Sequence, residues 1–192
     1  GFTVSNAGRA IVMGLSGSHF VKVPQGVARE TRRYYQQLTR FSAAFAFIAD
    51  ISLGSMGGAL KRKEKLSARL GDILSLMYLA TATLKRYEAE GRCAADAPLM
   101  HWAIWDCMFR IQLAFEGVIA NFPNKLFALV LRHLVVFPLG RPYVVPSDRL
   151  GHKVAALLIA PSATRDLLSS DVYLPTDIEE PVAALEAALL AT

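Results

Sequence analysis

Hydrophobic residues recur at alternating steps of four and three through Gly58–Gly91, the longest unbroken helical pattern in the chain. This spacing keeps one stripe of a helix apolar. The stripe comprises Leu66, Leu70, Ile73, Met77, Ala80, Leu84 and Tyr87. Other apolar residues widen it, namely Leu60, Leu74, Leu76 and Leu79. We therefore expect a central bundle helix with neighbours on more than one side, closed at Gly91 by the left-handed conformation that glycine adopts readily.

The same periodicity predicts a second long helix that begins at Val27. Its second half, Phe41–Leu53, contains Asp50 as its one formal charge, so we expect that half to be buried either between other helices or against a part of the protein outside this chain. Further helices are predicted over about Asn6–Leu15, from Asp96 and Pro98 to about Ala120, over Lys125–Phe137, from Ser147, over Ser162–Ser169 and after Pro175.

Three features refine these later helices. The Lys125–Phe137 helix is expected to be largely buried, with Arg132 and His133 on its outward side. Thr176 and Glu179 have capping-box spacing, which predicts the start of the last helix. The prolines and glycine of Pro138–Pro146 predict an extended crossing over the bundle. No strand pattern or repeat interrupts the series, so the expected fold is one all-α domain over residues 1–192, a multi-helix bundle of roughly six or seven helices.

Composition agrees with a single globular domain, because 53% of the 192 residues are hydrophobic and 19% are charged. The mean hydropathy of +0.33 is high, yet no uninterrupted apolar run reaches the roughly 18 residues of a membrane span. Two cysteines, Cys93 and Cys107, are too few for a disulfide scaffold and favour a reducing compartment.

The net charge of +5 suggests affinity for anions. Its densest source is Lys61, Arg62, Lys63 and Lys65, which are candidates for contact with an anionic lipid headgroup or a coenzyme phosphate. The alternative is that these residues only solvate the start of a helix. Basic residues are not interleaved with aromatic ones, so we expect no nucleic-acid binding; that hypothesis rests on net charge alone.

A second polar cluster lies after the extended crossing and comprises Arg141, Ser147, Asp148, Arg149 and His152, with Tyr143 nearby. It is either a docking surface or a hydrogen-bonded lid over the bundle.

Two charge pairs, Asp106 with Arg110 and Asp72 with Arg69, have helical spacing and are expected to be structural ion pairs. The histidines His19, His101, His133 and His152 lack the spacing of helical zinc ligands, so no metal site is expected.

Four segments carry a resemblance to a known family: RRYYQQLTRFSA, LKRKEKLSARLGDILSLMYLATATLKRYEAEGR, ANFPNK and FPLGRPYVVPSDRLGHKVA. They closely resemble the C-terminal region of the long bacterial acyl-CoA dehydrogenases of fatty-acid β-oxidation, and the resemblance spans about Val4 to Leu190. It implies that the chain is the C-terminal part of a longer enzyme. The implied reaction is the FAD-dependent α,β-dehydrogenation of a fatty acyl-CoA, in which a carboxylate removes the α-proton and the β-hydride passes to the flavin.

The flavin-binding core of that family is absent from these residues, and its catalytic glutamate does not map onto any glutamate here. The glutamates considered are Glu30, Glu64, Glu88, Glu90, Glu116, Glu179, Glu180 and Glu186. We therefore expect no catalytic or FAD-binding residue in this segment, which would be inactive alone and reach acyl-CoA only through the core.

The resemblance implies that the segment covers the core, completes a homo-oligomer or docks the enzyme on a membrane. The implied location is the bacterial cytoplasm, with possible peripheral contact at the inner membrane. The alternative function is a stand-alone helical module that binds lipids or acyl chains, as the apolar content and the basic cluster suggest.

Overall fold

Eight α-helices and no β-strand are found in the computed structural model, which describes residues 1–191. The helices are α1 (Phe2–Leu15), α2 (Arg32–Met56), α3 (Glu64–Ala89), α4 (Ala97–Ala120), α5 (Lys125–Val130), α6 (Asp148–Ile159), α7 (Ala163–Leu168) and α8 (Pro181–Leu190). A 3₁₀ segment, η1 (Gly57–Arg62), precedes α3, and a π-helical segment, η2 (Leu131–Val136), continues α5. The all-α prediction is confirmed.

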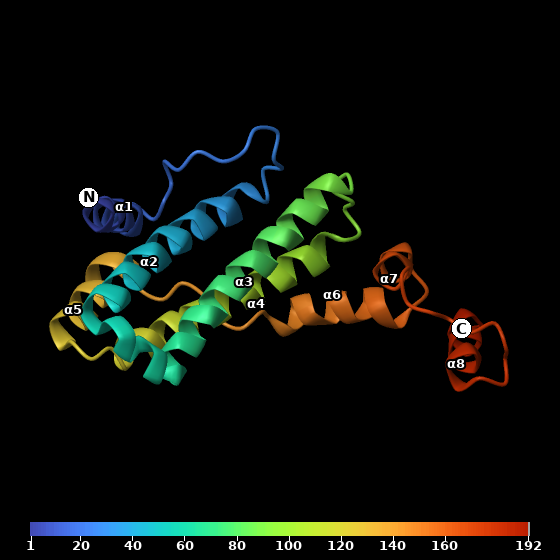
Figure 1. The fold of residues 1–192 in the computed structure, drawn as a ribbon. Coiled ribbons are helices and arrows are strands. Elements are labelled where there is room, and N and C mark those ends of the chain that lie inside the picture. Colours follow the sequence, from blue (N-terminus) through green and yellow to red (C-terminus); the bar gives the residue numbers. More distant parts are fainter. Residues whose placement is uncertain (192) are drawn as a thin grey trace.

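Helices α2, α3 and α4 run side by side and enclose the core, while α1 crosses α2 (Figure 1). Helix α4 supplies much of the core through six fully buried side chains, Ile104, Met108, Ile111, Phe115, Val118 and Ile119. The predicted stripe of α3 faces them and is buried except for Leu70, which is partly exposed. Neighbours on more than one side of α3 are confirmed, since it packs on both α4 and α2. Leu74 and Leu79 do not contribute to these contacts, because they are 54% and 53% exposed.

Two long helices begin later than their periodicity predicts. Helix α2 begins at Arg32 rather than Val27 because the Thr31 hydroxyl bonds both the Ala28 carbonyl (3.0 Å) and the Glu88 carboxylate (2.6 Å), which holds the preceding residues in a turn. Helix α3 begins at Glu64 because Gly57, with φ of +48°, ends α2 and is followed by the 3₁₀ segment. Lys61, Arg62 and Lys63 therefore precede α3 instead of forming its first turns.

The predicted Lys125–Phe137 helix is divided between α5 and η2, and the expectation that it is largely buried is wrong for its first half. Leu126 and Leu129 of α5 are 68% and 56% exposed, whereas Val135 and Val136 of η2 are buried. Helix α1 approaches η2 closely at Gly14, where an added Cβ would lie 2.7 Å from the Val135 carbonyl oxygen.

The predicted crossing begins with a turn at Pro138 and Leu139 and is confirmed from Gly140 to Pro146, where side chains of α4 hold it in place. The Gln112 amide donates to the Tyr143 carbonyl (2.9 Å) and accepts from the Tyr143 N–H (3.2 Å). The Trp105 indole N–H donates to the Val144 carbonyl (2.8 Å). These bonds satisfy backbone groups that an isolated extended segment would leave unpaired.

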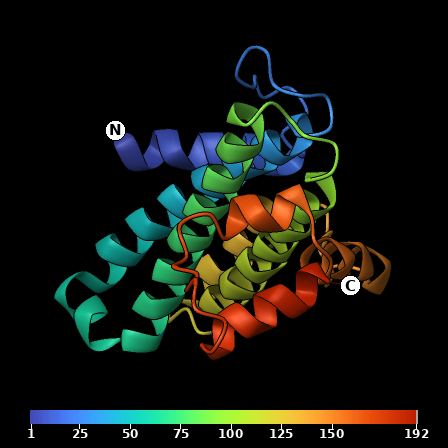
Figure 2. The ribbon, with the colours of Figure 1, turned by 90° about the vertical axis from the view of Figure 1, so that its right-hand side faces the viewer.

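Residues 148–190, containing α6, α7 and α8, form a C-terminal arm that extends to one side of the bundle (Figure 1). Figure 2 views the molecule from that side, with α7 and α8 in front of the bundle. Helix α6 packs on α4 and α7 packs on α6. As predicted, Ser147 and Ser162 cap α6 and α7 with their hydroxyl oxygens.

Two predicted caps are not formed. Asp96 stands at the N-cap of α4, but its carboxylate accepts a hydrogen bond from the Thr164 hydroxyl of α7 instead of capping the helix. The proposed capping box of Thr176 and Glu179 is wrong, because the Glu179 N–H bonds Asp177 (3.0 Å) and α8 begins only at Pro181.

The stretch Arg32–Arg62, which joins α2 and η1, is long and apolar enough to cross a membrane by length and composition alone. The sequence has no uninterrupted apolar run of about 18 residues. A helix whose apolar residues are interrupted by small polar ones can still be long and apolar enough on average. Since α2 packs against α1 and α3, its apolar composition also fits a core helix.

Candidate functional site

The predicted basic cluster lies at the turn between α2 and α3. Lys61, Arg62, Lys63 and Lys65 are all exposed, and within residues 1–191 none of them takes part in an ion pair. Leu53, in the last turn of α2, is also exposed. The turn thus presents unpaired positive charge close in sequence to exposed apolar surface.

The predicted docking cluster separates into two parts. Arg141 forms an ion pair with Glu116 of α4 (3.1 Å), and Ser147 caps α6, so both have structural partners. Asp148, Arg149 and His152 lie exposed on the first turns of α6. The first two residues therefore fit the hydrogen-bonded lid, and the other three remain available for docking.

An exposed apolar helix of the arm is α8, which the sequence pattern did not single out. Its sequence PVAALEAALL has one charged residue, Glu186, and Leu185 and Leu190 are 71% and 66% exposed. No other described helix packs extensively along it. The sequence could have revealed this feature, because a helix that is apolar on every face is normally buried.

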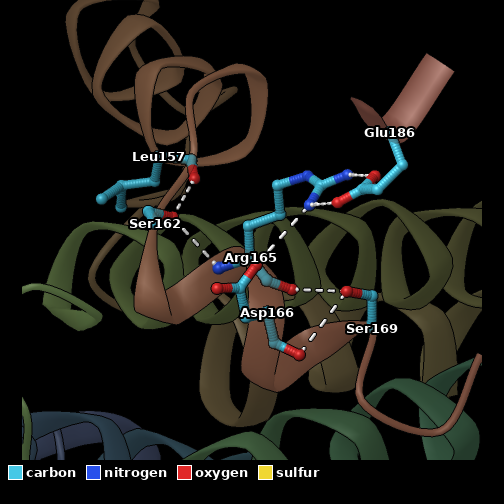
Figure 3. Close-up of polar contacts among 6 residues, drawn as sticks. All are labelled: Leu157, Ser162, Arg165, Asp166, Ser169 and Glu186. Atoms are coloured by element: carbon cyan, nitrogen blue, oxygen red, sulfur yellow. Dashed lines mark hydrogen bonds and ion pairs between the residues drawn. The ribbon is translucent and has the colours of Figure 1, made fainter. Parts of the chain in front are cut away.

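One bidentate ion pair links α8 to α7. The Arg165 guanidinium bonds both oxygens of Glu186, one of them at 2.8 Å (Figure 3). The bond from Arg165 lowers the pKa of Glu186, against the raising effect of burial. Arg165 itself is positioned by α7, whose cap at Ser162 also bonds the Leu157 carbonyl of α6 (2.6 Å).

A second anchored carboxylate, Glu88 near the end of α3, holds the loop before α2. It accepts hydrogen bonds from the Ala28 N–H (3.1 Å), the Thr31 hydroxyl (2.6 Å) and the Arg92 guanidinium (2.5 Å). Burial alone would raise the pKa of Glu88, but these bonds outweigh it and lower that pKa.

Flavin-dependent dehydrogenation of an acyl-CoA requires a carboxylate that removes the α-proton. A base for that step needs a pKa near the working pH, yet the shifts found for Glu88 and Glu186 are both downward. Glu90 and Glu116 are held by Arg86 (2.8 Å) and Arg141. These four glutamates therefore bond to side chains or backbone groups of this domain.

The remaining polar predictions have mixed outcomes. Asp106 and Arg110 form the predicted pair (3.5 Å). Arg69 and Asp72 do not form theirs, because Arg69 instead lies against Gly117 of α4, where an added Cβ would be 2.7 Å from its Nε. Within residues 1–191 no three histidine, cysteine or acidic side chains gather as metal ligands.

Fold and surface together define the class of this chain: an α-helical bundle domain with a projecting arm of exposed apolar helices. All residues, 1–192, match the family described as "Acyl-CoA dehydrogenase, C-terminal, bacterial type". The chain belongs to this family, as the resemblance of its segments indicates. No solved structure matches it.

Proposed function

We propose that this chain is the assembly domain of an FAD-dependent acyl-CoA dehydrogenase that catalyses the first step of fatty-acid β-oxidation. In this proposal the flavin, the acyl-CoA and the catalytic carboxylate are held by the rest of the enzyme. The family supports the enzyme class, and the ion-paired carboxylates of this chain support a role outside the chemistry. The bacterial cytoplasm, where acyl-CoA is handled, is the location we propose.

The observation that carries this proposal is the exposure of α8. Fully burying one exposed leucine contributes about 1.5–3 kcal/mol before the entropic costs of association, and α8 exposes several apolar side chains on one short helix. A helix of this composition is typical of an interface with a fixed partner, where aliphatic side chains form the contact. The partner we propose is the catalytic core or the arm of a second subunit in a homo-oligomer.

The substitution Leu185→Asp in the full natural enzyme tests this role. It places a charge where the interface has to be apolar, so we expect subunit association and flavin content to fall, with at least a several-fold loss of acyl-CoA oxidation. Thr176→Asp is the matched control, because it adds the same charge at an exposed position just before α8. Normal association, flavin content and activity in Leu185→Asp would contradict the proposal.

The division of labour has its own test. The isolated 192-residue chain should neither retain FAD after purification nor oxidise an acyl-CoA, as measured by flavin absorbance and dye reduction. Flavin binding together with turnover by this chain would place the chemistry here and overturn the assignment.

A second candidate function, peripheral membrane contact, is supported by the exposed basic cluster at the turn between α2 and α3. Each cation near an anionic bilayer contributes about 1 kcal/mol, so neutralising Lys61, Arg62, Lys63 and Lys65 to Gln should strongly reduce co-sedimentation with anionic vesicles. The control neutralises four other exposed cations, Lys22, Lys85, Lys125 and Lys153. Equal binding by the two variants would remove the cluster from the account.

A further inference from the structure

The guanidinium of Arg40 is buried inside the domain without a carboxylate partner. Its side chain is only 5% exposed. It donates to the Gln37 side-chain oxygen (3.2 Å) and to the Val136 carbonyl, and its Nε has no hydrogen-bond partner. Both acceptors are neutral, so they satisfy hydrogen bonds without supplying an opposite charge. A buried charge without a counter-ion destabilises a fold by several kcal/mol. The burial of Arg40 is therefore hard to explain by a structural role alone.

A second arginine, Arg33, lies about two turns earlier on the same helix and adds to the positive charge. Arg33 contributes to lowering the pKa of Arg40, after burial as the main cause. Arg33 donates to the Gln36 side chain (3.2 Å) and forms no ion pair among residues 1–191. It also lies in the first turn of α2, where the helix dipole disfavours a cation and no acidic residue compensates.

Both arginines line the same cavity, which has a volume of about 290 Å³ and lies between α2, the Gly17 turn, α4 and the extended crossing. The Tyr143 side chain also lines it, and its hydroxyl makes no hydrogen bond within the described chain. None of the described residues that line the cavity carries a carboxylate. The cavity therefore offers two cations and a hydroxyl with no internal anion.

We propose that this cavity binds the phosphate group of a small molecule, with Arg33, Arg40 and Tyr143 as its ligands. Two arginine forks match a dianion better than a single carboxylate, and arginine recognises phosphate through paired N–H donors. The cavity is larger than a phosphate ion, and Tyr34 and Trp105 give it aromatic walls. The phosphate source that fits these walls is a phosphate monoester rather than free phosphate. The site is independent of the proposed assembly role, since it lies within the bundle and not on the arm.

Calorimetric titration of the full natural protein tests the proposal with three probes: inorganic phosphate, phenyl phosphate and acetate. Phosphate and phenyl phosphate should bind, and acetate should bind at least tenfold more weakly. Tighter binding of phenyl phosphate than of phosphate identifies a monoester as the source, and equal binding identifies free phosphate. Failure of both phosphates to bind, or binding of acetate as tightly as phosphate, would overturn the proposal.

Variants locate the binding in the cavity. Arg33→Gln should weaken phosphate binding at least tenfold, while Arg32→Gln, which removes the same charge from the exposed neighbour on α2, should leave it unchanged. Tyr143→Phe keeps the buried ring and should weaken binding a few-fold, and circular dichroism verifies that each variant is folded. Equal losses in Arg32→Gln and Arg33→Gln would show general surface attraction and would contradict a built site.

Discussion

The bundle and the C-terminal arm are equally rich in apolar residues, but the bundle buries them and the arm leaves most of them exposed. In the bundle, α4 alone has nine buried side chains, and the stripe of α3 packs against them. In the arm, α6 has no buried residue, while α7 and α8 have one each, Thr164 and Ala183. Apolar side chains therefore stabilise the bundle, whereas most of those in the arm stay exposed, where the proposed partner would cover them.

The largest predicted difference between the regions is the effect of truncating an apolar side chain. Phe115→Ala opens a cavity at a fully buried position and should lower the free energy of unfolding by about 3–5 kcal/mol. Leu185→Ala should leave the stability of the isolated chain within about 0.5 kcal/mol, because that side chain is already 71% exposed. Urea unfolding of both variants measures this contrast. A similar loss in the free energy of unfolding at the two sites would contradict the difference between bundle and arm.

Glycine substitutions sharpen the comparison within the bundle itself. Gly14→Ala would push a methyl group against the Val135 backbone and should cost about 1–3 kcal/mol. Gly71→Ala meets no atom within 4 Å on an exposed turn of α3, so it should stabilise the chain by about 0.5–1 kcal/mol. Thermal unfolding should therefore shift in opposite directions for the two variants, and a stabilised Gly14→Ala would contradict the close approach of α1 to η2.

The smallest effect concerns pH and the arm. The bond from Arg165 lowers the pKa of Glu186, so this link contributes fully above the ordinary glutamate pKa and is lost as pH falls through the lowered value. Labels on α7 and α8 should therefore move apart in acid, below about pH 4. Glu186→Gln should show separated labels already at pH 7. Constant separation in both proteins across this range would show that another contact holds α8.

The sequence predicts the packed region better than the exposed one, for physical reasons. Periodicity identified α3 and its buried stripe, because there a single packing surface decides the pattern. It misplaced the start of α2, because Thr31 is held by Glu88, a residue far away in the chain. It also predicted burial for Leu126 and a neighbour for Leu74, since an apolar face does not reveal whether its partner belongs to the same chain.

The candidate sites divide in the same way. The basic cluster around Lys61 was recognisable from its charge run, and the structure leaves it exposed and unpaired. The docking cluster could not be divided in advance, because the partner of Arg141 is Glu116 on a different helix. Arg40 gave no signal at all, since a cation on a long helix is normally solvated and only the fold shows that this one is buried.

Hydrogen exchange of the full natural enzyme, compared with that of the isolated 192-residue chain, tests the central claim most directly. If the arm is covered in the enzyme, the amides of α8 should exchange at least tenfold more slowly in the full enzyme, while the buried amides of α4 should exchange at similar rates in both. Equally fast exchange of α8 in the two proteins would show that the arm stays uncovered, and would contradict an assembly role for this domain.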